Sequence, residues 1–265
     1  MSLSNKEILE REARRKKRTQ IALPTVFLLF LFLFWEFVIG DSLQFVLPKP
    51  SLIIRQIVVI APIIWRGAKV TILEAFTGLL IGTTIGILVA IGFVYNRTFA
   101  KTVYPYALIL RSLPLLALLP ILTGLMGPGF SSKITIIAFS TFFPILINMV
   151  QGFTSVNATS VELMHSLNAS RKEIFLKVRL PWALPYLFIA LKIAGSGAIL
   201  AAIISEYMYA IEGLGALMVS LMFSGRVADL WAAMFASAGL SLLVYGLILL
   251  MERWLVPWGK YVKES

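Results

Sequence analysis

Two basic side chains fall within long apolar stretches of this sequence, where a charge is expensive. Arg111 lies in the stretch 103–127, just before Pro114, and Lys192 lies in the stretch 183–207. If these stretches cross a membrane, each charge costs about 2.5–3.5 kcal/mol at a helix centre, and charges kept at that cost tend to be functional. Guanidinium and ammonium groups bind anions, so both residues favour an anionic ligand. The alternative is that both side chains reach the membrane interface, or bond carbonyl groups freed beside Pro114.

Covalent chemistry at a serine is the second possibility. Residues 194–197 read AGSG, which is similar to the Gly-x-Ser-Gly nucleophile of intramembrane serine proteases but lacks its first glycine. The single histidine, His165, lies in a charged segment outside the apolar stretches, so no pair between Ser196 and a histidine is expected at depth. The sequence contains no cysteine and no Gly-x-x-x-x-Gly-Lys-Ser/Thr phosphate loop. We therefore expect no enzyme activity, no metal and no cofactor in this chain.

The composition indicates an integral membrane protein. Of the 265 residues, 59% are hydrophobic and 14% are charged, and the mean hydropathy is +0.88. The net charge of +11 could suggest nucleic acid, but the basic residues gather in short segments between apolar runs, which is the pattern of membrane topology. The fold class is therefore expected to be an all-α polytopic membrane protein in contact with the lipid bilayer, with no nucleic acid partner.

Six membrane spans are expected in a single domain over residues 21–258. Their approximate ranges are 21–39, 70–95, 103–127, 133–152, 183–207 and 230–250. A basic segment, 1–20, precedes the first span, and a short tail, 259–265, follows. Lys and Arg are more frequent in the segments placed inside, so both termini are expected in the cytoplasm. An interfacial helix is expected outside, over 52–64.

Small residues and prolines predict how these spans pack and bend. Pro105, Pro114 and Pro120 predict kinks or a break in the third span. Two strips of small residues at four-residue spacing predict close helix packing. The strips are Gly78, Gly82, Gly86 and Ala90 in the second span, and Ala190, Ala194, Ala198 and Ala202 in the fifth.

A charged segment, residues 159–185, interrupts the apolar sequence and predicts two short helices at an angle. Thr159 with Glu162, and Ser170 with Glu173, have the spacing of capping boxes that start helices. Asn168, between them, suits the left-handed conformation that ends a helix. A compact segment of this kind between two spans is typical of a docking element.

The same segment resembles the EAA loop of ABC importer permeases, a coupling helix that sits in a groove of a cytoplasmic ATPase. The family pattern is Glu-Ala-Ala, three residues, Gly, nine residues, Ile-x-Leu-Pro. The positions that carry the resemblance, with Leu167 added from the apolar edge, are Glu162, Leu163, Met164, Leu167, Asn168, Val178, Leu180 and Pro181. Glu162, Leu180 and Pro181 match directly, and the other family positions are substituted. The resemblance implies that 159–181 couples this chain to an ATPase.

Other phrases resemble permeases of the nitrate, sulfonate, taurine and bicarbonate group. They are the text around Arg111 and Pro114, the pair Phe143-Pro144, and Glu206 followed by the Gly-Leu-Gly at 213–215. The resemblance implies a type I ABC importer permease in a bacterial inner membrane, working as a homodimer or a heterodimer. The partners it implies are an ATPase that carries ATP and Mg, and a periplasmic or lipid-anchored solute-binding protein.

The transported solute is expected to be a small anion of the nitrate, sulfonate, taurine or bicarbonate type. Arg111, Pro114, Lys192 and Glu206 are the candidate residues of the translocation path. The same group of permeases also includes importers of pyrimidine vitamin precursors and aromatic acids, which stay open as alternatives. A secondary transporter is a more distant alternative, since it predicts a longer chain or an internal repeat.

Overall fold

The computed structural model describes residues 5–38, 45–209 and 211–259, and within these ranges the chain folds into helices joined by turns. The helices are α1 (Asn5–Val38), α2 (Pro50–Val59), α3 (Ala61–Tyr95), α4 (Arg97–Arg111), α5 (Leu115–Met126), α6 (Phe130–Thr154), α7 (Ala158–Ser166), α8 (Arg171–Ile174), the π-helix η2 (Phe175–Arg179), α9 (Leu180–Tyr209), α10 (Leu214–Phe223) and α11 (Val227–Leu255). The predicted all-α fold is confirmed.

Four stretches of helix are long and apolar enough to cross a membrane, among the residues described. They are α3, α6, the continuous run Arg171–Met208 and α11. The expected third span is instead two shorter helices, α4 and α5, separated at Ser112–Pro114, as the prolines predicted. Leu113 precedes a proline and is therefore disfavoured in the helical conformation, which explains where α4 ends.

The segment before the second span differs from the expectation. The predicted interfacial helix 52–64 is wrong in its second half, because α2 ends at Val59 and α3 already begins at Ala61. Pro62 lies in the first turn of α3, where its missing N–H would have no intrahelical partner anyway. The apolar helix is therefore longer than the expected 70–95 and turns sharply away from α2 at Ile60.

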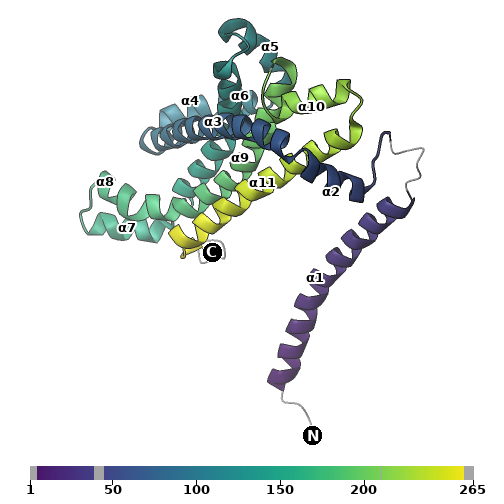
Figure 1. The fold of residues 1–265 in the computed structure, drawn as a ribbon. Coiled ribbons are helices and arrows are strands. Elements are labelled where there is room, and N and C mark those ends of the chain that lie inside the picture. The colour runs from purple at the N-terminus through teal and green to yellow at the C-terminus, as the bar shows by residue number, and fades with distance from the viewer. Residues whose placement is uncertain (1–4, 39–44, 210, 260–265) are drawn as a thin grey trace.

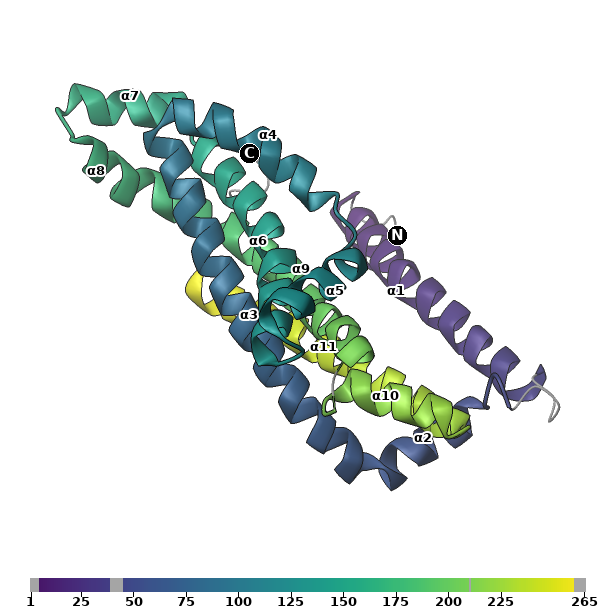
Figure 2. The ribbon, with the colours of Figure 1, turned by 90° about the horizontal axis from the view of Figure 1, so that it is seen from above.

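The body of the molecule is built on α3, α6 and α9, which lie side by side in Figures 1 and 2. Gly82 on α3 lies so close to α6 that an added Cβ would be 2.5 Å from the carbonyl oxygen of Ala138. Gly78 is similar, since its Cβ would be 2.5 Å from Cβ of Ile137. The alanine strip of α9 is also buried. Both small-residue strips therefore serve close packing, as predicted.

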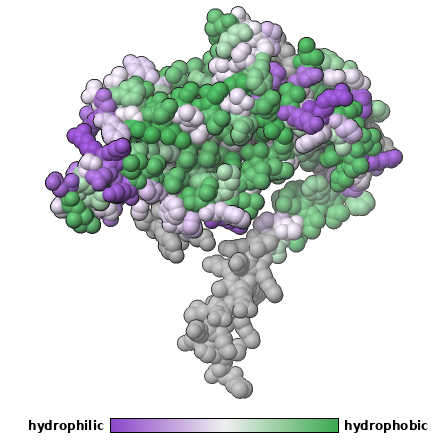
Figure 3. All heavy atoms as spheres, turned by 60° about the vertical axis from the view of Figure 1, so that its left-hand side comes forward, coloured by the Kyte–Doolittle hydropathy of each residue, from purple (hydrophilic) through white to green (hydrophobic). Residues whose placement is uncertain are grey.

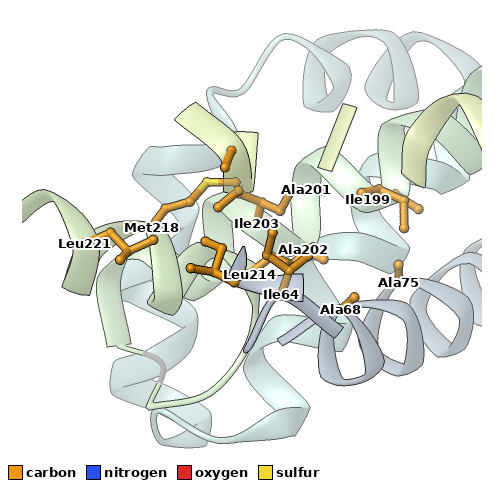
Figure 4. Close-up of a cluster of buried hydrophobic side chains, with 14 of the residues drawn as sticks. Ile64, Ala68, Ala75, Ile199, Ala201, Ala202, Ile203, Leu214, Met218 and Leu221 are labelled. Carbon is orange, nitrogen blue, oxygen red and sulfur yellow. The ribbon is translucent and has the colours of Figure 1, made fainter. Parts of the chain in front are cut away.

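Two apolar clusters occupy the two ends of this body. The first joins α2, α3, α9, α10 and α11, and Figure 4 shows side chains such as Ile64, Leu214 and Met218 converging within it. The second contains Phe93, Phe153 and other aromatic and aliphatic side chains where α3, α6 and η2 meet. The segment with α7 and α8 projects from this second end, opposite α2 and α10 (Figures 1 and 2).

Helix α1 extends away from the body in Figure 1. Its C-terminal end contacts the body: Trp35 packs edge-on against Trp231 with ring centroids 5.6 Å apart, and Glu36 accepts hydrogen bonds from the backbone N–H and hydroxyl of Ser51. The apolar side chains of residues 23–38 are mostly exposed in the single chain. The body itself carries a broad hydrophobic belt between hydrophilic ends (Figure 3), as a membrane protein requires.

Candidate coupling segment and translocation path

Helix α7 begins at a residue that the sequence reasoning overlooked. The side chain of Asn157 accepts a hydrogen bond of 2.9 Å from the backbone N–H of Thr159 and is the N-cap. Thr159 therefore lies inside the first turn, and the predicted capping box between Thr159 and Glu162 is wrong. Asn caps helices as well as Thr does, and its position two residues earlier starts the helix sooner. Glu162 is thereby left exposed, without the capping role expected for it.

The end of α7 follows the prediction. Asn168 has a backbone φ of 58°, the left-handed conformation expected of it. The backbone N–H of Asn168 donates to the carbonyl of His165, and that of Ala169 donates to the carbonyl of Met164. These bonds satisfy the last carbonyls of the helix and reverse the chain toward Ser170.

The second half of the segment is only partly as predicted. The capping box of Ser170 and Glu173 is confirmed: the hydroxyl accepts from the N–H of Glu173, and the carboxylate accepts from the N–H of Ser170 at 2.9 Å. However, α8 is not a separate short helix. It continues through the π-helix η2 into α9, and the N–H of Leu180 reaches back five residues to Phe175. Pro181 has no N–H to donate, and a π-turn accommodates the break without ending the helix.

The candidate coupling residues fall into an exposed set and a half-buried set. Leu163 and Leu167 are 60% and 69% exposed on one edge of α7, and Met164 beside them is half-buried. Val178, Leu180 and Pro181 are half-buried where η2 joins α9. The second half of the motif therefore lies apart from the exposed edge of α7, at the root of the segment, which is the junction of η2 with α9.

Two hydrogen bonds hold that root on the body. Arg179 donates to the carbonyl of Phe153 on α6 at 2.9 Å, and the indole of Trp258 donates to the carbonyl of Pro181 at 3.2 Å. The exposed edge of α7 is thus presented on a base that is fixed to α6 and to the C-terminal residues.

The candidate path residues are not brought together into one site. Arg111 is the last residue of α4 and Pro114 the N-cap of α5, and both are exposed at the break between these helices. Lys192, in contrast, forms an ion pair of 2.7 Å with Glu252 of α11, and each side chain is only 11% exposed. The ammonium group of Lys192 is therefore neutralised between two helices.

Glu206 is buried, with 1% of its surface exposed. Its carboxylate accepts from the hydroxyl of Thr71 at 2.7 Å and from the N–H of Gly215 at 2.6 Å, while that hydroxyl accepts from the N–H of Leu214. Gly213, with φ of 120°, lies against the carboxylate where a Cβ would overlap it. Glu206 thus fastens the turn before α10 onto α3, which is a positioning role.

A buried ion pair that the sequence reasoning missed joins α3 to α6. The ammonium group of Lys133 lies 2.7 Å from Oε1 of Glu74, and the two side chains are 11% and 1% exposed. Lys133 was expected at the outer boundary of the fourth span. Glu74 was a usable signal, since a lone carboxylate in an apolar helix requires a partner.

These features define a membrane-spanning protein with a projecting segment, α7 and α8, that is the candidate for coupling, and the comparisons identify a transport subunit. Residues 82–260 match the model of the binding-protein-dependent transport system inner membrane component, and the chain belongs to this family. It is an ABC importer permease and not an enzyme, with ATP hydrolysis on a separate subunit.

Two relatives and one solved structure illustrate the family. The chain is 29% identical to the formylaminopyrimidine transport permease protein ThiX of Halalkalibacterium halodurans over 249 residues, covering 92% of this chain and 99% of that protein. It is 25% identical to the putative aliphatic sulfonates transport permease protein SsuC of Bacillus subtilis, covering 96% and 94%. A crystal structure of an amino acid ABC transporter superposes with a TM-score of 0.62 at 20% identity, covering 74% of this chain and 95% of that one, which supports the type I fold.

Proposed function

We propose that two permease copies, either two of this chain or this chain and a related one, form the path for a small heterocyclic solute of the aminopyrimidine type. The Lys192–Glu252 pair supports a neutral solute over an anionic one, because it removes one of the two cations that favoured an anion. The relative ThiX, named for a formylaminopyrimidine and matched over 99% of its length, supports the same class. An external solute-binding protein delivers the solute, and ATP with Mg is bound by the partner ATPase.

A continuous helical run offers a route for coupling. The run Arg171–Met208 begins beside α7 and ends at the turn that Glu206 fastens to α3. At 1.5 Å per residue it is about 55 Å long, enough to cross the membrane. Closure of the ATPase pair on α7 would therefore be transmitted along a single rod to the opposite end of the body. Lys192 and Glu252 tie α11 to that rod and make it move with α9.

The position of Arg111 supports a second copy. Its side chain is exposed on the single chain, at the break between two apolar helices. A charge facing lipid at this depth is costly, whereas a charge facing a water-filled path between two copies is not. The exposed Arg111 also keeps an anionic solute of the sulfonate type as a second candidate, which the likeness to SsuC supports.

Uptake measurements separate the two solute classes. In proteoliposomes that contain the permease, its ATPase and its solute-binding protein, we expect ATP-driven uptake of radiolabelled formylaminopyrimidine that ethanesulfonate does not compete away. Uptake by Arg111→Gln should then stay within about threefold of that by the unmodified permease. A neutral solute forms no ion pair with Arg111, so the substitution removes no interaction worth roughly 1 kcal/mol or more. If uptake instead follows ethanesulfonate and falls in Arg111→Gln, the anionic candidate replaces the heterocyclic one.

We further propose that the α7 side of the molecule and both termini face the bacterial cytoplasm. The chain contains no cysteine, so single cysteines report position without background. Ser131→Cys and Ser224→Cys, both exposed, should react with an impermeant maleimide added outside intact cells. Ser160→Cys on α7 should react only after the membrane is opened. Reaction of the α7 cysteine from outside would reverse the proposed orientation.

A further inference from the structure

A cavity of about 350 Å³ lies between α7, the C-terminal end of α3 and the α8–η2 segment. Three basic side chains contribute to its wall: His165 from α7, Arg171 from α8 and Arg179 from η2. Two aromatic rings, Tyr95 and Phe175, and three aliphatic side chains complete the wall. The cavity therefore combines cationic groups with an apolar, partly aromatic surface.

The positive charge of this wall is not compensated by an acidic neighbour in it. None of the lining residues is acidic. Glu173, the acidic residue of the same segment, is held by Ser170 and by Lys177 at 3.4 Å and does not line the cavity. Arg179 uses one N–H on the carbonyl of Phe153, which fixes its guanidinium and leaves further N–H groups for a ligand. Uncompensated guanidinium groups at a concave surface favour a phosphate or carboxylate.

The cavity lies on the side of α7 that is turned toward the body. Val161 and His165, one helical turn apart, line the cavity. Leu163 and Leu167 are also one turn apart, and each comes two residues after one of that pair. Two residues correspond to about half a helical turn, so the leucines point roughly the opposite way and are exposed. The docking edge for the ATPase and the cavity are thus on opposite edges of one helix, so a small ligand can occupy the cavity while the ATPase is docked.

We propose that this cavity is a regulatory site for a phosphorylated aromatic compound, distinct from the transported solute. The basic groups hold the phosphate, and the aromatic rings and aliphatic side chains contact the planar part of the ligand. Its walls come from α3, α7 and the α8–η2 segment, so an occupant ties the coupling helix to the body. A tied α7 transmits the motion of the ATPase differently from a free one, and the ligand therefore changes the rate of substrate-stimulated ATP hydrolysis.

The test uses the purified complex of permease and ATPase with three probes: phenyl phosphate, inorganic phosphate and phenol. We expect phenyl phosphate to bind more tightly than either of the other two in isothermal titration, because only it fills both parts of the cavity. Arg171→Gln should weaken phenyl phosphate binding by about tenfold or more, the usual loss for a hydrogen bond to a charged group. Lys172→Gln, which removes a charge from the next exposed residue outside the wall, should leave binding unchanged.

Hydrolysis measurements provide the second readout. Saturating phenyl phosphate should change substrate-stimulated ATP hydrolysis in the unmodified complex and in Lys172→Gln, but not in Arg171→Gln. The proposal would be overturned if phenyl phosphate bound no more tightly than phenol. It would also be overturned if phenyl phosphate bound equally to the Arg171→Gln and Lys172→Gln complexes. Binding to the isolated permease that disappears when the ATPase is added would also overturn it, since the cavity would then receive a side chain of the ATPase.

Discussion

Leu167→Asp is expected to release the ATPase from the purified complex and to abolish uptake, while the permease itself still folds. Leu167 is 69% exposed, so the substitution removes little packing within the chain. At a docked interface, however, the new carboxylate would be buried without a partner, at a cost of several kcal/mol. A loss of about 4 kcal/mol corresponds to roughly a thousandfold weaker binding. Co-purification of the two subunits, followed by uptake in proteoliposomes, measures the effect.

Ala158→Asp is the matched control for this experiment. It adds the same charge to the same helix, but at the exposed first position of α7, roughly opposite Leu167. An acidic residue in the first turn also favours the helix itself. We expect Ala158→Asp to keep the ATPase bound. If Leu167→Asp co-purifies and transports as Ala158→Asp does, α7 is not the coupling element.

Glu162→Gln addresses the charge of the same segment. Because Asn157 caps α7, the carboxylate of Glu162 has no capping role to lose, and the substitution removes only its charge. We expect the ATPase to stay bound and substrate-stimulated ATP hydrolysis to fall several-fold. A fall of this size corresponds to the loss of one charged hydrogen bond between Glu162 and the ATPase. Unchanged hydrolysis would assign the coupling to the apolar edge alone.

Lys133→Met is expected to cause a large loss of stability. It leaves Glu74, which is 1% exposed, as an uncompensated carboxylate between α3 and α6. Breaking one partner of a buried ion pair costs about 3–5 kcal/mol, whereas replacing both by apolar residues is often nearly neutral. The double variant Glu74→Met, Lys133→Met should therefore regain most of the stability. Thermal unfolding of the detergent-solubilised permease, followed by fluorescence, measures both.

Lys101→Met is the control for Lys133→Met. Lys101 is exposed on α4, so removing its charge should change stability by no more than about 0.5 kcal/mol. With the single variant Glu74→Met added, the two single variants and the double variant complete a cycle that gives the coupling energy of the pair. If Lys133→Met and Lys101→Met unfold at the same temperature, the Glu74–Lys133 pair contributes nothing to folding.

Local chemistry made several parts of the coupling segment predictable. The reversal at Asn168 and the capping box of Ser170 and Glu173 depend on side chains that bond their own backbone within three residues. The break between α4 and α5 depends on the ring of Pro114, which disfavours the helical conformation of the residue before it. The cap at Thr159 was misplaced because Asn157 competes for the same N–H groups, and both choices were visible in the sequence.

The sequence by itself determined that this is an all-helical membrane protein with a capped, charged segment between two spans, since hydropathy, prolines and caps act over short distances. Only the tertiary structure decided the roles of its buried charges. Lys192 meets Glu252, sixty positions away, and Glu206 meets Thr71 across a distance of 135 residues. Which charges are paired depends on the helix faces that pack together. Gly195 of α9, for example, lies close against Ile248 of α11, and the strips of small residues predict such close packing without telling which charges it brings together.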